Sequence, residues 1–413
     1  MKRFLSATLL ALMISATPAS CARHAGPTTA PPAAPQPAAA SSTSAPPSSA
    51  QSPAPSRIPE RLTDAEFWKL IEDLSEPGGS FRSDNLLSNE VWLQNVIPDL
   101  LSVARQGRVY MGVGPEQNFT YIAALKPSIV FITDIRRGNL DLHLMYKAIF
   151  EMSADRADFV ARLFSRKRPD GLTTASSVRE IFQAFAEIPK DEPLFEENLQ
   201  AIYDHLEKTH GFALEPEDEP GIRYVYRYFG EVGPDLTYWM SGGFGPGRGG
   251  GFRNSPTYAD LMTAADESGT LRSFLASEEN YNVLKTLESK NLLVPVVGNF
   301  AGPKALRAVG AWVKAHNGLV SAFYLSNVEQ YLNMDGIWMD FCANASHLPI
   351  DETSQFIRSY RGGGPGFGGG ASLNQGMNAM TVDLKLCVDS KQWTVDSRRL
   401  TVDGRRWTVD RLR

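Results

Sequence analysis

The sequence has little cysteine, no excess of positive charge and no long apolar run after its first residues. Its three cysteines, Cys21, Cys342 and Cys387, lie far apart in a chain of 413 residues, which excludes a zinc ribbon and a disulfide-dense scaffold. There are 41 basic and 46 acidic side chains, giving a net charge of -5, so we expect no nucleic acid as a partner. The sequence contains neither HExxH nor GxSxG, and it predicts no metal ligands. It leaves open whether Cys342 pairs with Cys387.

The first 21 residues have the pattern of an export signal. Lys2 and Arg3 precede an uncharged stretch of 13 residues, which is too short to span a bilayer as a helix and ends in small residues before Cys21. The segment resembles a bacterial lipoprotein signal, although Pro18 stands where that motif usually has leucine. The resemblance implies a lipid on Cys21 and a membrane as partner. The alternative is ordinary cleavage after Ser20 or Ala22. We expect an exported protein, periplasmic or membrane-anchored, or a cytoplasmic one if the signal is not used.

Both ends of the mature chain have a composition that does not favour a packed core. In residues 23–57, 29 of 35 residues are Ala, Pro, Ser or Thr, so we expect residues 22–57 to be a disordered, extended linker. Residues 388–413 contain three copies of a seven-residue repeat with the consensus TVD, which we interpret as a translated tandem DNA repeat without a functional role. The folded domain is therefore expected over residues 58–387.

The periodicity of that domain predicts alternating strands and helices. Thr63 and Glu66 form a capping-box pattern at the start of a helix, and Pro98 bends or restarts a second helix over residues 91–105. We expect strands at 108–111, 128–134, 221–229, 292–298 and 319–325, and helices at 119–125, 140–153, 277–289 and 303–316. Residues 154–211 read as a mostly helical insertion, and residues 81–90 as a polar loop. The fold class is α/β.

A glycine turn and an acidic residue carry the main functional signal. Gly112 and Gly114 follow the first strand of this series, where a backbone must come close to a ligand. Asp134 ends the next strand, 22 residues after Gly112, where a carboxylate can accept the hydroxyl protons of a ribose. This order of elements predicts a nucleotide-type or nucleoside-type pocket. The alternative is a tight turn followed by a carboxylate that caps a helix.

The residues around the turn narrow the ligand. Gln117 stands where the dinucleotide motif GxGxxG requires a small residue, which makes NAD or FAD a less favoured ligand. Asp134 would repel the additional phosphate of NADP. Arg136 and Arg137, which follow it, nevertheless keep NADP as a possible ligand. The segments GVGPEQN and TDIRR resemble motifs of class I S-adenosylmethionine-dependent methyltransferases. Longer segments, among them GVGPEQNFTYIAALKP and VPVVGNFAGPKALRAVG, look like an uncharacterised bacterial family with a methyltransferase-like fold, over roughly residues 81–364.

This resemblance implies a doubly wound, mostly parallel Rossmann sheet with a helical insertion, and S-adenosylmethionine as the cofactor. Asn299 and Asn327 follow later strands, and the carboxyl ends of parallel strands share one crevice; loop hydrogen bonding or capping is the alternative role. Glu329 is a further candidate there, and His143 is interpreted as structural. The expected cofactor-binding residues are Gly112, Gly114, Glu116, Gln117, Asn118, Asp134, Arg136, Asn299 and Asn327.

Two functions remain open. The first is a methyltransferase that acts on a small molecule or an exported protein, because methyl transfer needs little more than a nucleophile held in line with an activated methyl group. The second is a non-catalytic, envelope-associated lipoprotein that reuses the fold to bind another small molecule. The glycine-rich loops 242–251 and 361–370 lack the GKS or GKT of a phosphate-binding loop, so we interpret them as surface loops, one of which could close over a pocket.

Overall fold

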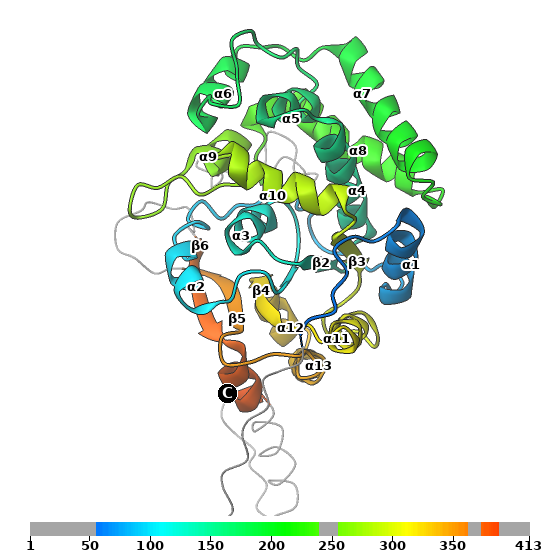
Figure 1. Cartoon of the computed structure of the whole chain (residues 1–413), viewed down its shortest axis with the longest axis vertical. Coiled ribbons are helices and arrows are strands. Elements are labelled where there is room, and N and C mark those ends of the chain that lie inside the picture. The colour runs from blue at the N-terminus through cyan, green and yellow to red at the C-terminus, as the bar shows by residue number, and fades with distance from the viewer. Residues whose placement is uncertain (1–54, 239–254, 362–372, 388–413) are drawn as a thin grey trace, which may run out of the picture. The chain divides into compact units, whose positions relative to one another are not determined.

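The computed structural model describes residues 55–238, 255–361 and 373–387. The signal segment with Cys21, most of the linker, both glycine-rich loops apart from Arg361, and the C-terminal repeats lie outside these residues. Within the described part a single sheet forms the centre of the domain (Figure 1). Its strands are β1 (Val109–Gly112), β2 (Ile129–Asp134), β3 (Leu293–Val297), β4 (Val320–Ser326), β5 (Gln355–Arg361) and β6 (Leu373–Ala379).

The strand order is β3-β2-β1-β4-β5-β6. All neighbouring pairs are parallel except β5 and β6, which are antiparallel. The order runs outward from β1 to β3 and then reverses to β4, so the carboxyl ends of β1 and β4 flank the switch point of the sheet. The expected mostly parallel α/β sheet is therefore confirmed, and its order is compatible with a Rossmann-like fold. The sequence did not predict β5 or β6.

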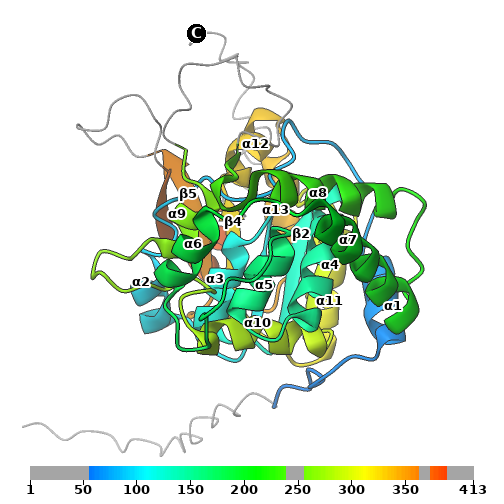
Figure 2. The ribbon, with the colours of Figure 1, turned by 90° about the horizontal axis from the view of Figure 1, so that it is seen from above.

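Helices cover both faces of the sheet. Figure 1 shows α3, α4 and α10 on one side, with α5 to α9 beyond them, and α11 to α13 on the other; Figure 2 shows α4, α5, α7, α8 and α10 from above. The helices are α1 (Asp64–Leu74), α2 (Ile97–Val103), α3 (Gln117–Leu125), α4 (Arg137–Met152), α5 (Arg156–Leu163), α6 (Val178–Ala186), α7 (Glu192–Asp204), α8 (Asp218–Val232), α9 (Tyr258–Thr263), α10 (Glu278–Ser289), α11 (Ala305–Ala315), α12 (Val328–Met334) and α13 (Trp338–Ala345). A π-helical turn, η1 (His205–Thr209), follows α7, and a 3-10 turn, η2 (Gly233–Asp235), follows α8. Residues 380–387 are also helical.

Several local predictions are confirmed with their physical causes. Thr63 and Glu66 form the expected capping box at the start of α1. Of the helix predicted over 91–105, only residues 97–103 are helical, as α2. Pro98 lies in its first turn, after a turn region, so it begins the helix and does not bend it. The strand predicted over 292–298 is β3, and it pairs with β2 although it contains Pro295, which lies opposite Ile132. A residue without an N–H is tolerated there because β3 is an edge strand. The helical insertion over 154–211 contains α5, α6, α7 and η1.

The predicted strand over 221–229 is wrong, because these residues belong to α8. The tyrosines at 224, 226 and 228 alternate as in a strand, but the buried residues Ile222, Val225, Tyr226 and Phe229 follow the spacing of a helix. Tyr224 lies on the outer side and is 43% exposed. Burial at helical spacing outweighs the preference of tyrosine for strands.

One continuous hydrophobic core joins the sheet to its helices. Phe119 in α3 is fully buried in this core, and its ring centroid lies 5.0 Å from that of Tyr146 and 5.7 Å from that of His143, both in α4. Cys342 in α13 forms a disulfide with Cys387, which answers the question of pairing that the sequence left open. Of the helices in the described residues, none combines the length and apolar character needed to cross a membrane.

Candidate functional site

The glycine turn after β1 is held by the side chain of Asn118. The Asn118 amide donates to the carbonyls of Val113 and Pro115 at 2.9 and 2.8 Å, and its oxygen accepts from the Tyr110 hydroxyl at 2.9 Å. A Cβ at Gly112 would overlap the Asn118 side chain. Gly114 adopts a φ of +78°, which favours glycine. Both glycines therefore serve the internal packing of the turn.

Arg136 neutralises Asp134 at the end of β2. Its guanidinium donates to Oδ1 and Oδ2 of Asp134 at 2.9 and 2.7 Å, and its backbone N–H donates to Oδ1 at 2.9 Å. Both side chains are less than a tenth exposed. A carboxylate has about four acceptor positions, so these three bonds leave one position for a further donor.

His143 in α4 supports the glycine turn. Its Nε2–H donates to the carbonyl of Gly114 at 3.0 Å, since the carbonyl can only accept. Burial lowers the pKa of His143 to about 4, and the charges of Asp134 and Arg136 also act on it. The ring is therefore neutral, and its Nδ1 is an acceptor without a hydrogen-bond partner in the described residues. His143 was expected to be structural, and its bond to Gly114 supports the glycine turn.

Glu116 and Gln117 lie buried at the start of α3. The Oε1 atom of Glu116 accepts from the backbone N–H of Ser88 at 3.0 Å, and burial raises the pKa of Glu116 to about 8. Gln117 donates through Nε2 to the hydroxyl of Tyr324 at 3.2 Å. Glu116 Oε2 and Gln117 Oε1 have no partner in the part of the chain that the structure describes. Buried polar atoms of this kind are costly unless water or a ligand satisfies them.

Glu90 is a site residue that the sequence analysis missed. It comes from the loop expected to be merely polar, and it lies at the switch point of the sheet. Its carboxylate accepts from Tyr324 at 2.6 Å, Ser326 at 2.8 Å and Gln375 at 3.0 Å. Burial raises the pKa of Glu90 although these hydrogen bonds act against it. Nothing in the local sequence marks Glu90, because its partners come from β4 and β6.

Asn299 and Asn327 follow the ends of β3 and β4 as expected, but they are differently engaged. The Asn299 side chain accepts from the backbone of Ala301 at 2.9 Å, and its own backbone donates to Glu76 at 3.1 Å. The side chain of Asn299 is thus used within its own loop. Asn327 is half-buried and precedes α12 without capping it through its side chain. Glu329 pairs with Arg358 at 2.6 Å.

The contacts of Glu90, Glu116, Gln117, Asn118 and His143 form a buried polar network at the carboxyl ends of β1 and β4. It contains two carboxyls with raised pKa values, Glu90 and Glu116, and a neutral imidazole, His143. Perturbed groups of this kind gather at functional sites, where a protonated carboxyl can donate a hydrogen bond at neutral pH. The arrangement suits recognition of a polar group by hydrogen bonds.

A separate hollow of about 570 Å³ lies at the amino ends of the strands. It is lined by Ile58, Lys126, Ser128, Glu279 and Lys290, among others, and Lys126 pairs with Glu279 across its edge at 2.7 Å. Its charged side chains form an exposed ion pair, which contributes little binding energy. It lies at the opposite end of the strands from the glycine turn and is not part of the candidate site.

A family model described as a domain of unknown function, DUF7790, matches residues 86–215 and 255–394, together more than half of the chain. The chain belongs to this family. The DUF7790 match begins just before Glu90 and includes every expected site residue of the folded domain. A search of curated proteins finds no match.

Proposed function

We propose that this DUF7790 protein is an exported, methyltransferase-like protein that binds S-adenosylmethionine at the carboxyl ends of β1, β2 and β4. The observation that carries the proposal is the group of buried polar atoms around the glycine turn. Glu116 Oε2, Gln117 Oε1 and His143 Nδ1 have no hydrogen-bond partner among the described residues. All three residues belong to the loop and helices next to the switch point, where open α/β sheets bind ligands.

The residues present have the capacity that this cofactor needs. Asp134 retains one acceptor position for a ribose hydroxyl beside Arg136. Gln117 offers an acceptor for an amine or an amide N–H, and the neutral His143 another. The cofactor, when bound, supplies an activated methyl group. The protein then has to orient the cofactor and exclude water. The hydrogen bond between Tyr324 and Glu90 lies at the switch point and would form one wall of the site.

Calorimetric titration of the full chain tests this proposal. S-adenosylmethionine and its demethylated product should bind at micromolar order, and Asp134→Ala should abolish binding. Asp351→Ala is the matched control, because Asp351 also pairs with an arginine, Arg108 at 2.7 Å, but lies by the amino end of β1. A wild-type chain that is folded and binds neither compound would contradict the proposal.

A second candidate is a non-catalytic envelope protein that binds another small molecule. Two features favour this candidate, because both reduce the room for a nucleoside. Arg136 binds Asp134, and the Asn118 side chain fills the space beside Gly112. The same titration separates the two: a ligand from the cell envelope that binds when S-adenosylmethionine does not would support the second.

Export is supported by the disulfide between Cys342 and Cys387, because disulfides persist in oxidising compartments. We propose that Cys21 carries the lipid anchor. Membrane fractionation of cells that express the wild type and Cys21→Ala tests this step. The wild type should be processed and found with membranes, and the variant should leave them. An unprocessed wild type in the cytosol would contradict the export proposal.

A further inference from the structure

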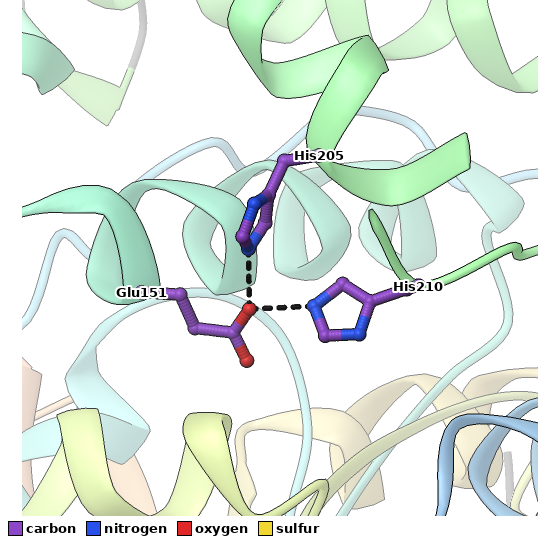
Figure 3. A group of neighbouring side chains, drawn as sticks. All are labelled: Glu151, His205 and His210. Carbon is purple, nitrogen blue, oxygen red and sulfur yellow. Dashed lines mark hydrogen bonds and ion pairs between the residues drawn. The ribbon is translucent and has the colours of Figure 1, made fainter. Parts of the chain in front are cut away.

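A carboxylate and two histidines meet on the side of the domain formed by α4 and η1. His205 Nε2 and His210 Nε2 each lie 2.6 Å from the same atom, Oε2 of Glu151 (Figure 3). The ligand atoms of the three residues all lie within 4.8 Å of one another. The exposed fractions of the side chains are 9% for Glu151, 19% for His205 and 12% for His210, so the cluster is sheltered but reachable from solvent.

The π-helical turn brings the two histidines together. Residues five apart in an α-helix point about 140° away from each other, since each residue turns by 100°. In η1 the backbone N–H of His210 bonds to the carbonyl of His205 at 3.1 Å, the i to i+5 pattern of a π-turn. The ring centroids consequently lie 4.9 Å apart. Such turns are rare in proteins, and those that occur often lie at functional sites.

Neighbouring side chains orient the ligand atoms as they do around bound metals. His210 Nδ1 donates to Asp64 Oδ1 at 2.7 Å, which leaves Nε2 as the coordinating atom. Asn291 in turn donates to the same Asp64 oxygen at 2.8 Å. This chain of a carboxylate, a histidine and a ligand position is the usual support of zinc-bound histidine.

Lys147 fixes the other half of the Glu151 carboxylate. Its ammonium lies 2.8 Å from Oε1 of Glu151 and 2.6 Å from Oδ1 of Asn291. Lys147 therefore occupies Oε1 and leaves Oε2 directed at the histidines. A carboxylate held in this way offers one oxygen to a metal.

We propose that Glu151 Oε2, His205 Nε2 and His210 Nε2 form a binding site for a divalent transition metal, with Zn²⁺ the ion that best fits two imidazoles and one carboxylate. Three protein ligands of these types leave the fourth position of a tetrahedral ion open to water. The metal takes the place of the Nε2 protons that now donate to Glu151. The His210 proton is released to water, because Nδ1 keeps the proton that it donates to Asp64, and the His205 proton is released to water or carried on Nδ1.

This site is independent of the nucleoside pocket. Glu151 lies at the carboxyl end of α4, 14 residues after Arg137, which corresponds to about 21 Å along a helix that rises 1.5 Å per residue. Its two histidines come from the helical insertion, whereas Glu151 belongs to the helix that packs on the sheet. Bound zinc would therefore attach the insertion to the α/β core.

Titration with zinc chloride tests the inference. The full chain, produced without a polyhistidine tag and treated with chelator, should bind one equivalent of Zn²⁺. His205→Gln and His210→Gln should each weaken this binding by more than about tenfold, and Asp64→Asn by about tenfold through the loss of its support. His347→Gln is the control, because His347 is exposed and its side chain bonds only to the carbonyl of Ala343 among the contacts described. The absence of binding, or binding that the two histidine variants leave unchanged, would overturn the inference.

X-ray absorption of the wild type loaded with one equivalent of zinc decides the question even if the variants fail to fold. We expect only nitrogen and oxygen neighbours at about 2.0–2.2 Å, with scattering from two imidazoles. A sulfur neighbour, or fewer than two imidazoles, would refute the site.

Discussion

Arg136 binds Asp134 through the Nε and Nη2 atoms of its guanidinium and through its own backbone N–H, at 2.7–2.9 Å. The two residues are only two positions apart, so the end of β2 and the turn after it supply the two partners of a buried ion pair. The acid that ends β2 is therefore neutralised before any ligand arrives. This relationship fixes the direction in which the remaining acceptor of Asp134 points.

Removal of Arg136 should destabilise the domain strongly. Arg136→Ala leaves the Asp134 carboxylate buried without its partner, and the free energy of unfolding should fall by about 3 kcal/mol or more. The measurement is urea denaturation followed by circular dichroism. Arg223→Ala is the matched control: Arg223 also makes a two-pronged contact with a carboxylate, that of Glu196, but both side chains are half-exposed. It should cost about 0–1 kcal/mol. Equal losses in the two variants would contradict the role of burial.

Gly112→Ala should damage the glycine turn. The added methyl group would displace the Asn118 side chain, which holds the carbonyls of the turn and accepts from Tyr110. We expect a loss of about 1–3 kcal/mol in denaturant unfolding. Gly138→Ala is the control, because a Cβ there meets nothing within 4 Å and the residue is helical. That variant should gain about 0.4–1 kcal/mol. A neutral Gly112→Ala would show that the turn can rearrange.

The buried carboxyl of Glu116 should make the protein less stable as the pH rises. Burial and the nearby charge of Glu90 raise the pKa of Glu116 to about 8 from 4.5. The folded state then binds a proton that the unfolded state has lost, so its stability falls between these two pH values, by up to about 1.4 kcal/mol per pH unit. The stabilising effect is complete below the lower value and lost above the higher one.

Glu116→Gln removes this titration and keeps the acceptor for Ser88. Unfolding free energies measured over a series of pH values should therefore decline less steeply in the variant than in the wild type. Glu66→Gln is the control: the hydrogen bonds from Thr63 lower the pKa of Glu66, so its loss should not alter the slope above the ordinary pKa of glutamate. Parallel curves for wild type and Glu116→Gln would show that Glu116 is ionised in the fold.

The disulfide should contribute to stability in an oxidising environment. Cys342 and Cys387 close a loop with a sequence separation of 45 residues, and a crosslink of this length contributes about 2–4 kcal/mol. Denaturation of the wild type with and without reducing agent should reveal this difference. The double variant Cys342→Ala, Cys387→Ala should unfold like the reduced wild type and should not respond to reductant. A wild type that ignores reductant would argue against the bond.

Sequence reasoning worked best where one segment decides its own structure. The capping box at Thr63, the apolar strands β2 and β4 and the glycine turn could all be predicted, because their signals lie within a few residues. It failed over α8, where the alternating tyrosines concealed the helical spacing of the buried residues. It also missed β5 and β6, the latter an antiparallel edge strand that contains Gly376 and polar residues.

The candidate site shows the same division. The sequence placed Gly112, Gly114 and Asp134 at strand ends, since their spacing along the chain depends on the local order of elements. It could not show that Glu90 reaches the switch point, because Tyr324 and Gln375 are 234 and 285 positions away. Nor could it show that Glu151 meets His205 and His210, whose contact depends on the docking of η1 against α4.

The sequence by itself therefore determined the α/β alternation, the glycine turn and the acid at the end of β2. Hydrophobic periodicity and local turn chemistry suffice for these features. Only the tertiary structure decided which side chains share a buried environment: Glu90 with Tyr324, and Glu151 with two histidines. The physical reason is that pKa values, ion pairing and metal geometry depend on distances of a few ångströms between residues far apart in the chain, and packing alone sets those distances.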